Sequence, residues 1–300
     1  MKKKTYLFAL MAMALTLGSC SDNENGIGGE TSKYITVSTS IGNMTRVATD
    51  AKGGQTFEEG DEISVYAWTG DATVAPETRE RVVNNAINKL TNGSWVSTPQ
   101  MLWKNNRDKH YFIGVYPISA ISDLSAGEYT FDETKQVESD LLVAVNKDGL
   151  SYNVDEQQTV PLTFTHVMAK LVVNLTYKNQ WGGIPTVEKV VVGNAAKEAT
   201  INYLTKVVTP STTAKEDFSL PEITENTKYV SVIIPQEEVT QLTIVIGGKN
   251  FVYDNGTPFK LESGKITTVN LEVGRDEIKL GDVKITNWED GSTFSGEALN

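Results

Sequence analysis

Short stretches of alternating apolar and polar residues, separated by turn residues, extend along most of the chain. The first stretch places Ile35, Val37, Thr39 and Ile41 at one set of positions and Thr36, Ser38 and Ser40 at the other. A period of two puts the two sets on opposite faces of an extended strand, as expected when one face is buried. The pattern therefore predicts a strand from Tyr34 to Ile41.

Similar runs rich in β-branched and aromatic residues recur along the chain. They are Ile63–Trp68, His110–Tyr116, Leu141–Val145, Leu171–Tyr177, Val187–Val192, Tyr229–Ile234, Gln241–Ile246, Phe251–Tyr253 and Thr267–Val273. Turn dipeptides such as Asn92-Gly93 and Gly247-Gly248 lie between them. Many short strands at regular spacing predict an all-β protein built as a sandwich or barrel.

One segment has a different period. Glu80–Leu90 is predicted to be helical, because its apolar residues fall along one helical face. These residues are Val82, Val83, Ala86, Ile87 and Leu90.

The length of 300 residues suits one large or two ordinary domains. We predict two β-sandwich domains in tandem, an N-terminal one over residues 32–161 and a C-terminal one over residues 162–300. The division depends on length and strand pattern, since no internal repeat survives a residue-by-residue comparison.

The N-terminus has the features of an export signal. Three lysines precede an uncharged apolar stretch, Thr5–Leu17, which is shorter than the roughly 20 residues that span a bilayer. Leu17-Gly18-Ser19-Cys20 resembles the lipobox of bacterial lipoproteins, in which the cysteine sulfur is lipid-modified and the cysteine becomes the new N-terminus once the signal peptide, here residues 1–19, is removed. The alternative is a plain signal peptide cut elsewhere, with Cys20 an incidental thiol. Residues 20–31 are polar and glycine-rich, which predicts a flexible tether.

Composition excludes several classes of function. The net charge is −11, and removal of residues 1–19 with their three lysines makes it about −14, so nucleic-acid binding is not expected. The chain has one cysteine and two histidines, His110 and His166, which lie far apart in the sequence, and this argues against a Cys/His metal site or a Cys-His nucleophile pair. No cofactor is predicted, and an oxygen-ligand calcium site remains open.

The chain also lacks a convincing catalytic group. The densest acidic cluster, Glu58, Glu59, Asp61 and Glu62, lies in a glycine-containing turn, which is more typical of a solvated loop than of a glycosidase pair. We expect His166 to be a hydrogen-bonded structural residue and His110 to be exposed. Neither a nucleophile elbow nor a glycine-rich phosphate loop is present.

Several local patterns together resemble the fimbrillin family, the lipoprotein pilins and pilus-associated proteins of some Gram-negative bacteria. In order they are Tyr34–Ile41 with Thr45-Arg46, Phe57–Trp68, Trp103 with Tyr111–Pro117, Asp140–Ala144, Leu162–Leu171, Val232–Pro235 and Ile285–Trp288. The resemblance covers nearly the whole chain after the signal. It implies a non-enzymatic pilus subunit with two transthyretin-like β-sandwich domains.

The resemblance also implies an assembly mechanism. A protease cuts after an arginine near the first strand, here between Arg46 and Val47, and the removed strand carries Ile35, Val37, Thr39 and Ile41. A strand from a neighbouring subunit then fills the exposed groove. The alternative for Arg46 is an ordinary solvated loop arginine, as expected in an anchor member that keeps its lipid.

The C-terminal region offers a candidate donor strand. Its apolar positions are Ile278, Leu280, Val283 and Ile285, with a Gly-Asp break in the middle. The alternative is that these residues form simply the last strand of the second domain.

The sequence leaves open whether the subunit belongs to the shaft, the tip or the anchor. Its expected partners are other pilin subunits in a homo- or hetero-polymer, the outer membrane through the lipid anchor, and a host or bacterial surface ligand. The expected location is the cell surface and the fimbrium. The competing interpretation is a surface glycan-binding lipoprotein, since Trp68, Trp95 and Trp103 could serve as sugar platforms or as core residues.

Overall fold

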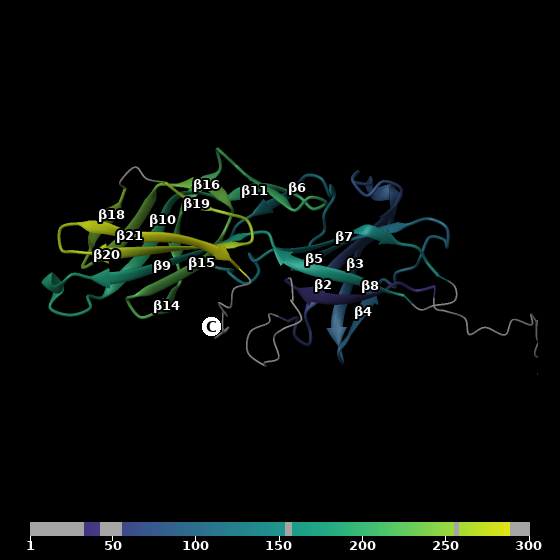
Figure 1. Ribbon diagram of the computed structural model, residues 1–300, viewed down its shortest axis with the longest axis horizontal. Helices are drawn as coiled ribbons and strands as arrows, with labels where there is room; N and C mark the ends of the chain where they lie inside the picture. Colours follow the sequence, from purple (N-terminus) through teal and green to yellow (C-terminus); the bar gives the residue numbers. More distant parts are fainter. Residues whose placement is uncertain (1–32, 43–55, 154–157, 255–257, 289–300) are drawn as a thin grey trace, which may run out of the picture. The chain divides into compact units, whose positions relative to one another are not determined.

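Strands make up most of the computed structural model, which describes residues 33–42, 56–153, 158–254 and 258–288 (Figure 1). Two one-turn 3-10 helices, Thr78–Glu80 and Asn179–Trp181, complete the regular structure of these segments. Within the same segments no helix has the length and apolar character that a membrane crossing requires. The predicted all-β class is confirmed.

The first sheet has seven strands, which lie between Thr36 and His166 in the sequence. Its order is β1 (Thr36–Ile41), β8 (Thr159–His166), β7 (Leu142–Leu150), β5 (His110–Tyr116), β2 (Glu62–Thr69), β3 (Arg81–Thr91) and β4 (Ser94–Thr98). All neighbours are antiparallel except β1 and β8, which run parallel. The two edges of this sheet are therefore β1 and β4.

Both faces of the first sheet are buried at its centre. Val65 and Ala67 of β2 contribute to one hydrophobic cluster, while the intervening Tyr66 and Trp68 contribute to a second cluster that continues into the C-terminal sheets. A strand buried on both faces reads as a continuous apolar run, which explains the sequence pattern of Ile63–Trp68.

The predicted helix over Glu80–Leu90 is wrong, because this segment forms strand β3. The ladder between β2 and β3 has extra residues on the β3 side near Asn85, whose φ is +55°. Such a bulge shifts the alternation, so that Val83 and Ala86, three positions apart, are both buried. The shifted spacing imitates that of a helix.

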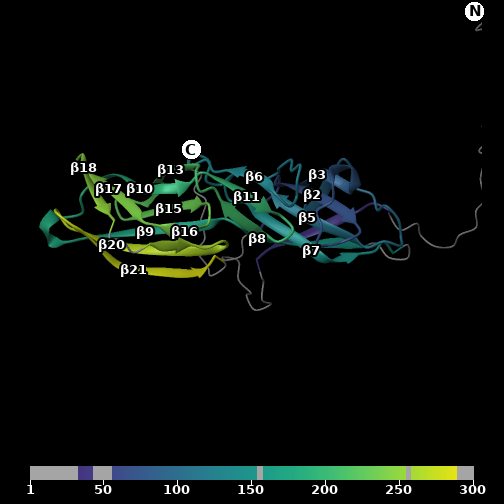
Figure 2. The same ribbon diagram turned by 90° about the horizontal axis from the view of Figure 1, so that it is seen from above.

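The C-terminal sheets form a sandwich. One layer is β13 (Lys215–Leu220), β10 (Val187–Ala196), β17 (Gln241–Ile246) and β18 (Lys249–Tyr253), and the other is β14 (Glu222–Thr224), β15 (Lys228–Ile233), β9 (Ala169–Tyr177), β20 (Lys265–Val273) and β21 (Ile278–Asn287). Figure 2 shows the two layers from the side, with β20 and β21 adjacent in the lower one. Their facing residues form one continuous core that includes Val190, Ile244 and Val173.

Two smaller sheets connect distant parts of the chain. β6 (Gly127–Thr130) pairs with β11 (Glu198–Asn202), which also pairs with β12 (Val207–Pro210), and β16 (Gln236–Val239) pairs with β19 (Phe259–Leu261). Residues 31–300 form one compact unit by their contacts. The expected boundary between Pro161 and Leu162 lies inside β8, and the chain passes from the first sheet to the sandwich at Val167-Met168. The division into two domains stays a prediction.

Candidate functional site

Strand β1 lies at an edge of the sheet, and it is the strand whose removal the family resemblance implies. It pairs only with β8, in parallel register from Thr36 opposite Thr159 to Ile41 opposite Phe164. Ile35 and Val37 are buried in the cluster inside the first sheet, and Ile41 packs against it. The alternation predicted from the sequence therefore places the apolar set inward.

The outer face of β1 is bound through hydroxyl groups. Thr36 Oγ1 lies 3.3 Å from Thr159 Oγ1, and the Ser40 hydroxyl donates to Thr163 Oγ1 at 3.1 Å. Hydrogen bonds of this exposed kind contribute little net stability. Most of the attachment of β1 therefore comes from its ladder with β8 and from its inward apolar side chains.

On the side of β1 that faces away from β8, the described residues form backbone hydrogen bonds only just before the strand. The Ile35 amide donates to the Met101 carbonyl at 2.9 Å, and the Trp103 amide donates to the Lys33 carbonyl at 3.2 Å. From Val37 onward β1 has no strand partner on this side among the described residues. The seven-stranded sheet is thus closed at the start of β1 and open along the rest of it.

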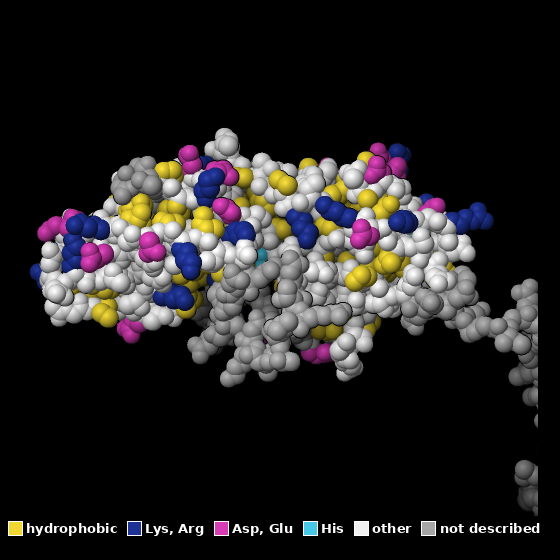
Figure 3. All heavy atoms as spheres, in the orientation of Figure 1, with side chains coloured by type: hydrophobic (Ala, Val, Ile, Leu, Met, Phe, Trp, Pro, Cys, Tyr) yellow, Lys and Arg dark blue, Asp and Glu magenta, His cyan; other side chains and the backbone are white. Residues whose placement is uncertain are grey.

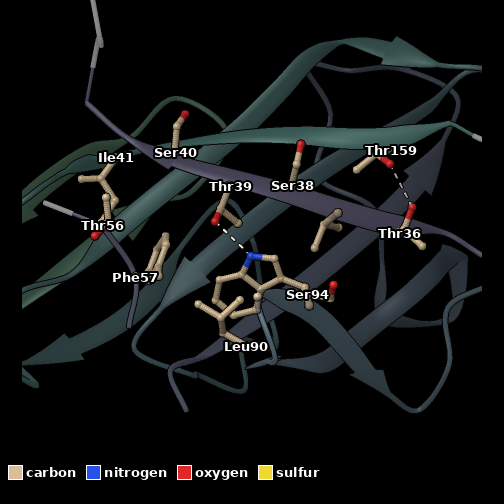
Figure 4. Close-up of a pocket in the computed structure, with 13 residues that line it drawn as sticks. Thr36, Ser38, Thr39, Ser40, Ile41, Thr56, Phe57, Leu90, Ser94 and Thr159 are labelled. Atoms are coloured by element: carbon tan, nitrogen blue, oxygen red, sulfur yellow. Dashed lines mark hydrogen bonds between the residues drawn. The ribbon is translucent and has the colours of Figure 1, made fainter. Parts of the chain in front are cut away.

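The opening forms a groove of about 580 Å³, which we call the edge groove. Its lining residues are Thr36, Val37, Ser38, Thr39, Ser40, Ile41, Thr56, Phe57, Leu90, Gly93, Ser94, Trp95 and Thr159. Trp95 of β4 also lines the groove, and its Nε1 donates to Thr39 Oγ1 at 3.0 Å. Figure 4 draws this bond as a dashed line at Thr39. The Trp95 side chain bridges the two sheet edges where backbone pairing is absent.

Phe57 occupies one end of the edge groove, beside Ile41 (Figure 4). Its ring makes edge-to-face contacts with Trp95, Tyr116 and Phe164 at centroid distances of 5.3, 5.4 and 5.1 Å. Contacts of this geometry are favourable beyond the area they bury. The aromatic cluster joins β4, β5 and β8 to the segment that precedes β2.

We predict that Thr39→Val destabilises the uncut protein by about 1 kcal/mol, because the Trp95 indole N–H loses its acceptor while the side-chain shape is kept. Urea denaturation followed by tryptophan fluorescence measures the change. Ser38→Ala, on the exposed outer face of β1, is the control and should change the free energy of unfolding by less than about 0.5 kcal/mol. Equal stability of Thr39→Val and the wild type would show that the Trp95 bridge does not hold β1.

The candidate donor segment is strand β21, which forms the edge of the five-stranded sheet and pairs only with β20. The Gly-Asp break seen in the sequence is a bulge, since Asn270 pairs with Asp282 and Leu271 with Leu280, which leaves Gly281 unpaired. Because of the bulge, the apolar residues before and after Gly281 lie on the same face of β21. Ile278, Leu280, Val283 and Ile285 lie opposite Val273, Leu271, Val269 and Thr267, all of them buried.

Directly opposed residues of an antiparallel pair point to the same face of the sheet. The four apolar residues of β21 therefore form one stripe on the face that is directed toward the core. Ile278 and Leu280 pack against the core, but Val283 is 36% exposed and Ile285 39% exposed. Half of the stripe is thus incompletely covered within the subunit.

The acidic cluster before β2 has structural partners. Asp61 accepts from the Glu58 amide at 2.7 Å, a Glu59 carboxylate oxygen accepts from the Gly93 amide at 3.3 Å, and Glu62 pairs with Lys89 at 3.0 Å. Burial and the neighbouring Asp61 carboxylate raise the pKa of Tyr116 to about 12. These side chains hold the turns at the mouth of the edge groove.

The structure agrees with the expectation for His166 but not with the expectation for His110. His166 Nδ1 lies 2.8 Å from Asp140 Oδ1, as expected for a hydrogen-bonded structural residue. The expectation that His110 is exposed is wrong: it is fully buried, and its Nε2 accepts from the Lys104 amide at 3.1 Å. The Trp103 ring packs edge-on against it, which the position of His110 at the start of a strand did not reveal.

Three of the predicted site residues, Cys20, Arg46 and Val47, lie outside the described residues. No group of His, Cys, Asp or Glu side chains within the described segments could hold a metal ion. Of the tryptophans considered as sugar platforms, Trp68 and Trp103 are buried and Trp95 is half-buried. On the face seen in Figure 3, Lys and Arg side chains are interspersed with Asp and Glu.

Solved structures share this fold. The crystal structure of "a putative cell adhesion protein" from Bacteroides ovatus matches with a TM-score of 0.64 at 18% identity, over 85% of this chain and 98% of that one. The crystal structure of a fimbrial protein from Bacteroides vulgatus matches with a TM-score of 0.52 at 12% identity, over 84% and 99%. The protein therefore has the β-sandwich fold of bacterial adhesion and fimbrial proteins.

Residues 45–288 match the family described as fimbrillin-like, so the chain belongs to the fimbrillin-like family of fimbrial structural subunits, which are not enzymes. A curated relative, "Putative fimbrium subunit Fim1C" of Bacteroides uniformis, is 24% identical over 315 aligned residues that cover 97% of both chains. The family resemblance recognised in the sequence is confirmed. The family places the protein in the fimbrium, a cell-surface appendage.

Proposed function

We propose that the chain is a fimbrial subunit that reaches the surface as a lipoprotein and polymerises by strand exchange. In this proposal Cys20 carries the lipid anchor in the outer membrane, and a protease cuts between Arg46 and Val47. Loss of β1 then opens a slot, and β21 of a neighbouring subunit fills it. The partners are other pilin subunits, identical or related.

The observation that carries the proposal is the position of β1 at the edge of the sheet with a buried inner face. Its removal frees the edge of β8 and vacates the positions of Ile35 and Val37, which are 3% and 6% exposed. An unpaired edge with vacant apolar positions is a template for another strand. Each restored hydrogen bond contributes about 0.5–1.5 kcal/mol net, and each reburied aliphatic side chain about 1.5–3 kcal/mol.

The slot left by β1 has β8 along one side. On the other side backbone partners are present only at the beginning of the slot, where Met101 and Trp103 bond to Ile35 and Lys33 just before β1. An incoming strand can therefore form hydrogen bonds along β8 and close the sheet at Met101–Trp103. Strand addition of this kind takes its affinity from the backbone and its specificity from the side-chain positions.

Strand β21 fits the requirements of the donor. The strand to be replaced has four inward positions, Ile35, Val37, Thr39 and Ile41, and the β21 stripe also offers four apolar side chains on one face. The family match also begins at residue 45, after β1, and ends at residue 288, after β21. Both facts support the proposal that β1 is discarded and β21 is retained.

A gel assay tests this proposal. Subunits recovered from the cell surface should run as a ladder of multimers in SDS without boiling and collapse to one band after boiling, because a strand buried in a neighbour dissociates slowly. The same preparation should show no binding on a glycan array, which is the behaviour expected of the competing glycan-binding class. A single monomer band together with specific glycan binding would overturn the proposal.

A further inference from the structure

The residue that follows β21 is buried far more deeply than the strand itself. Trp288 is 4% exposed, whereas Val283 and Ile285 of β21 are 36% and 39% exposed. Its backbone amide donates to the Gly264 carbonyl at 3.2 Å. Among the described residues, the C-terminal end of β21 is therefore held by the backbone and the buried side chain of Trp288.

Two buried polar side chains form the seat of the Trp288 ring. The His166 ring stacks on it in parallel, with centroids 4.2 Å apart and an angle of 6° between the planes. The Lys170 ammonium lies 5.6 Å from the centre of the indole, within the range of a cation–π contact. His166 is held in turn by Asp140, and Lys170 is 3% exposed.

The floor of the seat is a glycine turn. Gly264 has a φ of +66°, and a Cβ at this position would lie 2.9 Å from the His166 carbonyl oxygen. The Gly264 amide donates to the Met168 carbonyl at 2.9 Å, and the Ser263 hydroxyl donates to the Val167 carbonyl at 2.8 Å. The seat is thus built from the end of β8, the start of β9 and the turn before β20.

The burial of Trp288 in this seat also has an unfavourable contribution to the free energy. The Trp288 indole Nε1 is buried and has no hydrogen-bond partner among the described residues. Burial also lowers the pKa of Lys170 to about 8. Burying the indole N–H without a partner among the described residues costs free energy, which opposes the gain from burying the ring. Such a balance favours a contact that is specific but can open.

We propose that Trp288 is a releasable latch that keeps β21 on its own subunit until a neighbouring subunit takes the strand. This inference rests on the proposed role of β21 as donor. An edge strand detaches from its ends, and Trp288 holds the C-terminal end of β21. The nearby part of the apolar stripe, Val283 and Ile285, is more than one-third exposed and holds the strand less firmly. Opening of the latch therefore releases the strand from its C-terminal end.

Amide hydrogen exchange on the purified full-length protein tests the latch. Trp288→Ala should raise the exchange rates of the β21 amides about 10- to 100-fold, because local opening becomes easier. Trypsin should then cut faster after Lys279 and Lys284, which lie within β21. The amides of β2 and β5 should keep their wild-type protection, which shows that the variant is folded.

Two further variants and one control complete the test. Trp288→Phe keeps a stacking ring and removes the unpaired N–H, so exchange in β21 should stay at or below the wild-type rate. His166→Ala removes one wall of the seat and should accelerate exchange even if Trp288→Ala folds poorly. Trp95→Ala, the control, should leave β21 unchanged. Wild-type exchange of β21 in both Trp288→Ala and His166→Ala would overturn the latch.

The readout separates this inference from the proposed function. Exchange and proteolysis report on β21 in the isolated subunit, whether or not filaments form. Accelerated exchange in a subunit whose filaments do not depend on β21 would support the latch and refute the donor role. Wild-type exchange rates in β21, together with filaments that depend on β21, would refute the latch and support the donor role.

Discussion

Arg46→Ala is expected to abolish the incorporation of this subunit into filaments. Without the cut, β1 stays paired to β8, and the positions of Ile35 and Val37 remain occupied. An incoming strand would have to displace a covalently attached competitor, whose effective concentration is in the millimolar range or above. Immunoblots of sheared surface filaments measure the effect.

The control for this variant is Arg107→Ala, which removes an exposed arginine from a loop of the first sheet. It should assemble as the wild type does, and both variants should reach the cell surface in equal amounts. Wild-type filament levels with Arg46→Ala would contradict the proposed cleavage.

The double substitution Val283→Asp with Ile285→Asp is expected to block assembly while the monomer stays folded. Both side chains are more than one-third exposed in β21, so each change should cost about 1 kcal/mol or less in the monomer. In the slot of a neighbour the same positions would be buried, where an unpaired carboxylate costs several kcal/mol. Multimer ladders and urea denaturation of the monomer measure the two effects separately.

Lys284→Asp is the matched control for the double substitution. It changes the net charge by the same amount, two units, but it lies on the opposite face of β21. We expect it to assemble normally. If the control and the double substitution lose assembly equally, the apolar stripe does not enter a neighbour and β21 is simply the last strand of the sandwich.

The strands with one buried face could be predicted from the sequence because period-two alternation is a local property. Strand β1 is an example, with Val37 buried between the more exposed Thr36 and Ser38. Predictions from alternation were misleading where a β-bulge shifted the alternation by one residue. The bulge near Asn85 made β3 look helical, and the bulge at Gly281 made one apolar stripe look like two.

The groove and the latch depend on contacts between distant parts of the chain, which no local pattern contains. Trp95 bonds to Thr39, 56 positions away, and the seat of Trp288 consists of His166 and Lys170. The sequence marked Trp288 only as the last residue of Ile285–Trp288, one of the patterns that resemble the fimbrillin family. Its burial against a histidine could be recognised only once β8 and β21 were placed together by the fold.

The central claim is that β1 is a temporary strand, and the N-terminus of the assembled subunit tests it most directly. The subunit can be purified from sheared filaments and its first residue read by mass spectrometry of the N-terminal peptide. The account predicts a subunit that begins at Val47, without Cys20 and without residues 34–41. A filament subunit that still begins at lipidated Cys20 would contradict it.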